Sequence, residues 1–265
     1  MKKILVPTDF SDNAQKALDY ALKLAQVFDS ELCLVHTYKL IQRAGTFIAI
    51  EQQMREDAKR EMAKLVAKYE RQKPIQSRVI KDTPIRGIGR VAKSYQADLI
   101  VMGTKGASGL SELFIGSTTN GLIKHTRIPV LAVPQAAEFK PHQQIVFAMD
   151  QKAISQPSVL AIMRALANAW QAKVEVVQIL VHNKSGSIHE SFKKAMEGLD
   201  HELHFIPHNE SVNDGITEYL QQHSADLLCL IKRHRSFLQE LFHNSVTQKE
   251  AFHSELPLLV LHDKN

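Results

Sequence analysis

The chain has 265 residues, 44% of them hydrophobic and 23% charged, which predicts one or two globular domains with enough apolar material for their cores. No apolar run approaches the ~18 residues that span a membrane, and the segment after Met1 is too abrupt for a signal peptide, so we expect a cytoplasmic protein without membrane contact. The pI near 9.1 raises nucleic acid as a partner. Basic and acidic residues alternate along 51–69, however, and no aromatic-plus-basic stripe accompanies them, so nucleic-acid binding is not expected.

Short apolar runs alternate with amphipathic stretches along the first half. Apolar residues of Asp12–Phe28 recur at helical spacing, and Ser11 is the expected N-cap of that helix. The other expected elements are strands at 4–6, 32–35, 76–80, 97–102 and 128–133, and helices at 51–69, at 85–95 and from Ser117 onward. Strands that alternate with helices predict an α/β fold with a parallel sheet.

The second half repeats this order. Residues 97–101, 112–114 and 129 match residues 225–229, 240–242 and 257 at a constant offset of 128, whereas residues 3–9 match 144–150 at an offset of 141. The second copy is therefore 13 residues shorter, and the deficit falls at its short counterpart of the 51–69 helix. We expect two domains, 1–137 and 142–265. Cys33 and Cys229 lie in apolar runs of different halves, which favours buried, reduced thiols over a disulfide.

A glycine-rich segment follows the strand at 97–102. Gly103, Gly106, Gly116 and Ser117 have the spacing Gly-x2-Gly-x9-Gly-Ser. Glycines let a backbone approach an anion closely, and a helix that opens at Ser117 offers N–H groups and hydroxyls, so the segment suits phosphate. A dinucleotide-binding loop would place its glycines after the first strand, where Thr8–Asp12 has none, and the chain lacks the Gly-Lys pair of a Walker loop. The remaining alternative is a plain connection without a ligand.

The second copy lacks these glycines. At the offset of 128 they become Ile231, His234 and Asn244, while Ser117 is kept as Ser245. Side chains now occupy positions where a close backbone approach needs none, so the phosphate cradle is absent there. The basic residues at 232–235 leave two interpretations open, attraction of an anion by charge or a solvated basic turn.

With this glycine spacing, the opening segment Lys3–Ser11 and the closing strand at 128–133, the chain resembles the nucleotide-binding type of the universal stress proteins. The resemblance implies two tandem open parallel-sheet, Rossmann-like domains of the adenine nucleotide alpha hydrolase type. Their final strands, 130–133 and 258–261, would join edge to edge as an internal pseudo-dimer. It also implies ATP, or ADP or AMP, with Mg²⁺ or Mn²⁺, at the carboxyl ends of the strands of the first domain.

The same resemblance assigns the nucleotide-binding residues. They are Pro7, Thr8 and Asp9 at the adenosine end, Thr37 at the adenine edge, Met102 and Gly103 beside the ribose, and Lys105, Gly106, Gly116, Ser117, Thr118 and Thr119 around the phosphates. Asp9 has an alternative role at the start of the following helix, and Thr118 and Thr119 have one as an ordinary first helical turn.

We expect a stress-response regulator that binds adenine nucleotide and hydrolyses ATP slowly at most, because beyond Asp9, Lys105 and the hydroxyls no general base is evident. An ATP-using transferase or hydrolase with its second substrate in the C-terminal domain, and a nucleotide-free interaction protein, are the alternatives. The protein partner stays unknown and a further homodimer stays open.

Histidine is concentrated in the second half, with eleven of the 13 residues. His201, His204 and His208 raise zinc as a ligand, but in a strand residues four apart stand roughly 13 Å apart, too far for one ion. We therefore expect no metal site and treat these histidines as surface polar positions.

Overall fold

A computed structural model of the chain describes residues 1–39, 47–104, 115–181, 185–208, 211–233 and 256–263. The first copy contains β1 (Lys3–Pro7), α1 (Asp12–Phe28), β2 (Glu31–Tyr38), α2 (Phe47–Tyr69), β3 (Ile75–Lys81), α3 (Pro84–Tyr95), β4 (Leu99–Gly103), α4 (Ser117–His125) and β5 (Val130–Val133). The second contains β6 (Gln144–Ala148), η1 (Pro157–Leu160), α5 (Ala161–Trp170), β7 (Lys173–Val181), α6 (Glu190–Met196), β8 (His201–His208), α7 (Val212–Gln222), β9 (Leu227–Lys232) and β10 (Leu258–His262).

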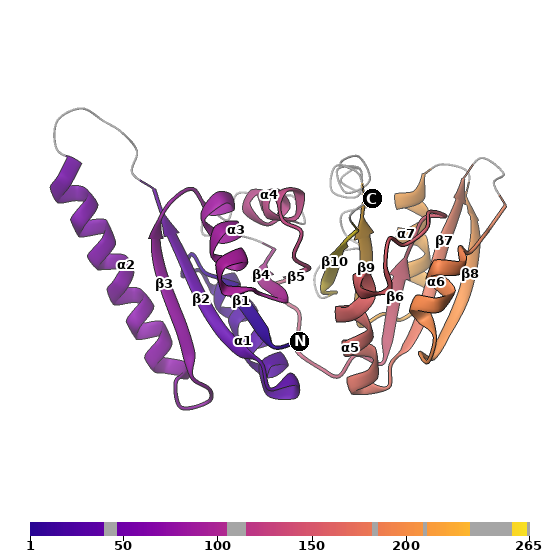
Figure 1. Ribbon diagram of the computed structural model, residues 1–265, viewed down its shortest axis with the longest axis horizontal. Coiled ribbons are helices and arrows are strands. Elements are labelled where there is room, and N and C mark those ends of the chain that lie inside the picture. The colour runs from indigo at the N-terminus through magenta and orange to yellow at the C-terminus, as the bar shows by residue number, and fades with distance from the viewer. Residues whose placement is uncertain (40–46, 105–114, 182–184, 209–210, 234–255, 264–265) are drawn as a thin grey trace.

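The described strands form one ten-stranded sheet in the order β3-β2-β1-β4-β5-β10-β9-β6-β7-β8. The order in the second half mirrors that in the first, which confirms the duplication. Neighbouring strands are parallel except β5 and β10, which run antiparallel. Figure 1 shows the two halves side by side, with β5 and β10 facing each other at the centre and α2 beside β3 at the outer edge.

The α1 helix follows the bounds expected from its periodicity. The Ser11 hydroxyl accepts a hydrogen bond from the Ala14 N–H, and Asp29 ends the helix in the left-handed region with a φ of 48°. Its apolar face packs on the sheet, where Leu18, Leu24 and their neighbours are fully buried. In the second copy the short α6 stands where the first copy has α2, as the length deficit predicts.

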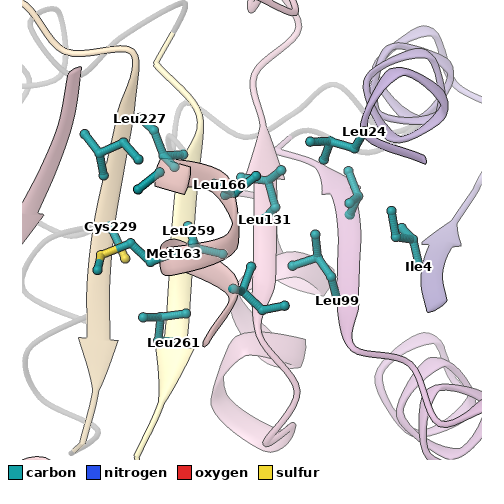
Figure 2. Packing of buried hydrophobic residues seen from close by; sticks show 14 of the residues in the cluster. Ile4, Leu24, Leu99, Leu131, Met163, Leu166, Leu227, Cys229, Leu259 and Leu261 are labelled. Atoms are coloured by element: carbon teal, nitrogen blue, oxygen red, sulfur yellow. The ribbon is translucent and has the colours of Figure 1, made fainter. Parts of the chain in front are cut away.

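The edge-to-edge pairing of the final strands is confirmed. Leu258, Leu259 and Val260 of β10 lie opposite Ala132, Leu131 and Val130 of β5. On one face of the sheet a single apolar cluster runs through this join, so that the buried side chains of both halves form one core. Figure 2 shows Leu99 and Leu131 beside Leu166 and Leu259 in this cluster.

The described residues also show the state of the cysteines, the character of the helices and the grouping of potential metal ligands. Cys33 and Cys229 are buried free thiols, as expected. None of the helices described is both long and apolar enough to cross a membrane. Within the described ranges, no group of three His, Cys, Asp or Glu side chains is placed to hold a metal ion.

Candidate functional site

The carboxyl ends of β1, β2 and β4 meet at one edge of the first domain. β1 is hydrogen-bonded between β2 and β4, and all three run parallel. Pro7 and Gly103 are therefore the last residues of adjacent strands, with Thr37 near the end of the third. The order in which strands are added to the sheet reverses here. β2 and β3 lie on one side of β1, whereas β4 and β5 lie on the other side. In open α/β sheets, such a switch point is where ligands bind.

A tight turn leads from β1 into α1. The Thr8 N–H donates to the carbonyl of Val35 (2.9 Å), and the Thr8 hydroxyl accepts from the Phe10 N–H (3.0 Å). Phe10 has a φ of 65°, a left-handed conformation that is unfavourable for a bulky residue. Its ring stacks on His36 with the ring centroids 4.4 Å apart. These contacts hold a strained turn at the edge where Asp9 is presented.

Asp9 is exposed, and one of its oxygens is engaged locally. Oδ1 accepts hydrogen bonds from the N–H (3.1 Å) and the hydroxyl (2.6 Å) of Ser11. Because Ser11 caps α1, the alternative role of Asp9 at the start of the helix has structural support. Asp9 therefore orients the cap residue while its carboxylate remains at the surface of the site.

His36 is a candidate that the sequence reasoning did not assign to the site. Its Nδ1 lies 2.9 Å from the carbonyl oxygen of Thr8, which can only accept, so Nδ1 carries the proton and Nε2 is an acceptor. Burial lowers the pKa of His36, opposed by the Thr8 carbonyl and by the charge of Asp9. The ring is thus neutral at pH 7. Its position directly before Thr37 at the end of a strand was the available signal.

Glycine at position 103 is needed for the packing of α1 on β4, in addition to its expected role beside a ligand. A Cβ at this position would lie 2.4 Å from Oδ1 and 3.0 Å from the backbone oxygen of Asn13. Asn13 is buried in the first turn of α1, and its Nδ2 donates to the carbonyl of Val133 (3.4 Å). Glycine therefore lets α1 approach the end of β4. A polar side chain on the buried face of the helix was the only sequence signal for Asn13.

The α4 helix begins beside the end of β4. The Thr119 hydroxyl donates to the Gly103 carbonyl (2.8 Å), and the Gly116 N–H donates to the Thr104 carbonyl. Both groups are thus used within the protein, and the α4 N-cap makes no side-chain hydrogen bond. Ser117 is exposed and Thr118 half-buried, so the first turn of α4 presents its polar groups at the surface.

The remaining expected residues divide into two groups. Pro7 and Met102 are buried strand residues, and Thr37 is half-buried, all at the carboxyl edge of the sheet. Lys105 and Gly106 lie outside the described residues. The structure therefore brings ten of the twelve expected positions to one edge, from β1, β2, β4 and α4.

Gly87 of α3 lies close against the Thr37 side chain, and its replacement by alanine gives a testable effect on stability. A Cβ on Gly87 would lie 2.9 Å from Thr37 Cγ2 and 3.0 Å from Asp82 Cβ and Ile80 Cδ1. We expect Gly87→Ala to lower the free energy of unfolding by about 1–3 kcal/mol, because the packed strand cannot retreat fully.

Gly89 provides the matched control two residues along the same helix. Apart from its chain neighbours and the nearby backbone of α3, no atom of the described residues lies within 4 Å of a Cβ built on Gly89. Gly89→Ala should therefore raise the free energy of unfolding by about 0.5–1 kcal/mol through helix propensity. Urea denaturation followed by circular dichroism measures both. Equal shifts in the two variants would show that Gly87 is not held against Thr37.

The second copy keeps the backbone of this edge but changes its side chains. The Met149 N–H donates to the Val177 carbonyl, which corresponds to the bond from Thr8 to the Val35 carbonyl in the first copy. The Lys152 N–H donates to the Asp150 carboxylate, which corresponds to the bond from Ser11 to the Asp9 carboxylate. Ile231 stands at the position of Gly103. His234, Asn244 and Ser245 lie outside the described residues.

The interpretation of residues 232–235 as a solvated turn is wrong for the first two. The Arg233 side chain is only 6% exposed, beside Asp150 and Asp263. Lys232 is half-buried, and its ammonium donates to the carbonyls of Ile123 (2.8 Å) and Lys124 (2.5 Å). A cation of the second domain therefore binds the C-terminal carbonyls of α4, where it is electrostatically favourable.

Comparison with known proteins places this architecture in a family. The model of the universal stress protein family matches residues 1–134 and again residues 141–262. The chain belongs to the universal stress protein family and contains two copies of its domain.

Relatives of single-domain length match about half of the chain. Universal stress protein MJ0531 of Methanocaldococcus jannaschii is 30% identical over 138 residues, which cover 50% of this chain and 81% of the relative. Universal stress protein YxiE of Bacillus subtilis is 30% identical over 144 residues, which cover 49% and 97%. The crystal structure of a universal stress protein from Archaeoglobus fulgidus covers 98% of this chain and 96% of its own, with a TM-score of 0.72 at 17% identity, a likeness of fold.

Proposed function

We propose that the first domain, residues 1–137, binds one adenine nucleotide, ATP or ADP or AMP, and that the chain is a cytoplasmic stress-response regulator. The observation that supports this most is the position of Asp9 and of the α4 N-terminus on the two sides of the switch point between β1 and β4. A carboxylate there suits the hydroxyls of a ribose, and the uncapped first turn of α4 suits phosphate.

The residues also fit a divalent cation that accompanies the nucleotide. Mg²⁺ is commonly held by one or two carboxylates together with substrate phosphates, and Asp9 with the hydroxyls of Ser117 and Thr118 supplies oxygen ligands of that kind. In this proposal the cation arrives with the phosphates, since no three candidate ligands gather among the described residues.

Binding with regulation is favoured over rapid catalysis. The Asp9 oxygen that accepts from Ser11 serves the start of α1, and the neutral His36 has its Nδ1 proton committed to Thr8. His36 keeps Nε2 as an acceptor, but burial lowers its pKa and makes the imidazole a weaker base, so slow hydrolysis at most is expected. A bound nucleotide would instead affect the position of α4. The C-terminal end of this helix is hydrogen-bonded to Lys232 of the second domain, residues 142–265, so the effect could reach that domain.

Ser117 offers a direct test of this site. We expect Ser117→Asp to weaken ATP binding at least ~10-fold, because a carboxylate at the α4 N-terminus repels the phosphates. The same charge favours the helix dipole, so the melting temperature should not fall. Calorimetric titration of the whole chain with ATP and Mg²⁺ measures the affinity and the expected single site per chain.

Two controls make that test decisive. Ser117→Asn, which is similar in size and neutral, should stay within ~3-fold of the wild type, and adenosine should bind both variants alike because it has no phosphate. Absence of saturable ATP binding to the wild type, or equal affinity of the Asp and Asn variants, would contradict the proposed site.

A further inference from the structure

The second domain contains a cavity of about 400 Å³ at the carboxyl ends of β6, β7 and β9. Ala148, Val177 and Ile231 line it from these strands, and Val212 and Ile216 line it from α7. Protein interiors are otherwise close-packed, and ligand pockets begin at roughly 300 Å³, so the hollow is of the size that a small molecule occupies.

The lining differs in character from the same edge of the first domain. Met149 takes the place of Thr8, as their matching backbone hydrogen bonds show, and Ile179, two residues after Val177, takes the place of Thr37. Ile231 replaces Gly103 and extends the apolar wall. Hydroxyls and bare backbone at the candidate nucleotide edge have thus become hydrophobic side chains, which favour an apolar occupant.

The charges of the cavity are already balanced. Arg233 Nε lies 3.5 Å from Asp150 Oδ1, and Arg233 Nη2 lies 3.7 Å from Oδ2 of Asp263, whose side chain is 0% exposed. Two carboxylates beside one guanidinium disfavour a phosphate at this place. Lys152 is exposed and contributes a charge at the rim.

The guanidinium of Arg233 is occupied within the protein. Its Nη1 donates to the Ala153 carbonyl (2.6 Å), and Nε and Nη2, which are buried, face the carboxylates of Asp150 and Asp263. Arg233 therefore closes the polar end of the cavity and offers a ligand no accessible charge. Gln178 offers little in its place, because its amide is bonded to the backbone of Ser187 at both ends.

We propose that the second domain binds an uncharged, mainly apolar small molecule in this cavity, against Met149, Ile179 and Ile231. This site is separate from the nucleotide site proposed for the first domain and does not depend on it. The duplication has in this view produced one domain for a charged ligand and one for a neutral ligand.

Nile red, a neutral dye whose fluorescence increases in apolar surroundings, is the probe. Titration of the whole chain should show saturable binding of one dye per chain that millimolar ATP does not displace. Val212→Glu should lower the dye affinity at least ~10-fold, because it places a charge at the half-buried edge of the cavity. Glutamate suits the first residue of α7, so folding should be preserved.

Leu203→Glu is the matched control, since Leu203 is 40% exposed on β8 and does not line the cavity. It should leave the dye affinity within ~2-fold. Displacement of the dye by ATP would identify the cavity as a nucleotide site and overturn the proposal. So would a lack of saturation, or equal dye affinity of the Val212→Glu and Leu203→Glu variants.

Discussion

Leu131→Glu is expected to lower the free energy of unfolding by at least about 4 kcal/mol, a large part of the stability of an ordinary domain. Leu131 is 0% exposed in β5 and lies opposite Leu259 of β10. The substitution removes apolar contacts from the core that both halves share and buries a carboxylate without a partner. Figure 2 shows Leu131 at the centre of this core.

The form of the unfolding transition carries further information. Because one cluster crosses the join, urea should unfold the wild type in a single transition, and Leu131→Glu should shift the signals of both halves together. Trp170 fluorescence reports on α5 and its contact with Phe28 of α1, and circular dichroism reports on the whole chain. Val27→Glu, at a position 45% exposed on α1, should change stability by no more than about 0.5 kcal/mol. Two separate unfolding transitions, in the wild type or in Leu131→Glu, would contradict the shared core.

Most of the fold could be predicted from the sequence because it depends on local and repeated patterns. The spacing in Asp12–Phe28 defined α1 at both ends, and the offsets of 128 and 141 defined the duplication. Strand bounds were less accurate. The strand expected at 32–35 extends to Tyr38, because pairing with β3 continues beyond the apolar run. The pairing of β5 with β10 followed from the family resemblance together with two apolar terminal strands.

The candidate site was predictable in position but not in its internal contacts. The approach of Asn13 to Gly103, and the bonds of Lys232 to the end of α4, join residues 90 or more positions apart, which no local pattern reveals. Phe10 gave no sign of a left-handed backbone, since such positions usually hold Gly, Asn or Asp. The burial of Arg233 contradicted the ordinary expectation for a basic turn, because Asp263 at the far end of the chain balances it.

His142 lies where the linker between the domains meets α1 and α5. Because this histidine is buried, we expect the protein to lose stability in acid. Its Nε2 is 2.9 Å from the Tyr20 hydroxyl, and its ring packs edge-on against Trp170 at 4.7 Å. The side chain is 1% exposed. Burial lowers the pKa of His142 to about 4, with Asp226 opposing and Lys140 adding to the shift.

The direction of the effect follows from the two states of His142. Unfolded, the imidazole takes up its proton near its usual pKa of about 6.5, whereas the folded protein resists protonation down to about 4. The contribution of His142 to the free energy of unfolding is therefore fully present above pH 6.5. It is lost as the pH falls toward 4, which lowers the free energy of unfolding by about 3 kcal/mol. His36 and His262 also have lowered pKa values through burial and contribute in the same direction.

The variant His142→Asn isolates this contribution, because it removes the titrating group while His36 and His262 remain. Urea denaturation at several pH values between 4 and 8 gives the slope of the unfolding free energy against pH for each protein. The variant should be less stable than the wild type at pH 8, where its lost packing dominates, yet show a shallower slope below pH 6.5. Parallel slopes would mean that His142 is protonated in the folded protein, and the hydrogen bond with Tyr20 would then not require a neutral ring.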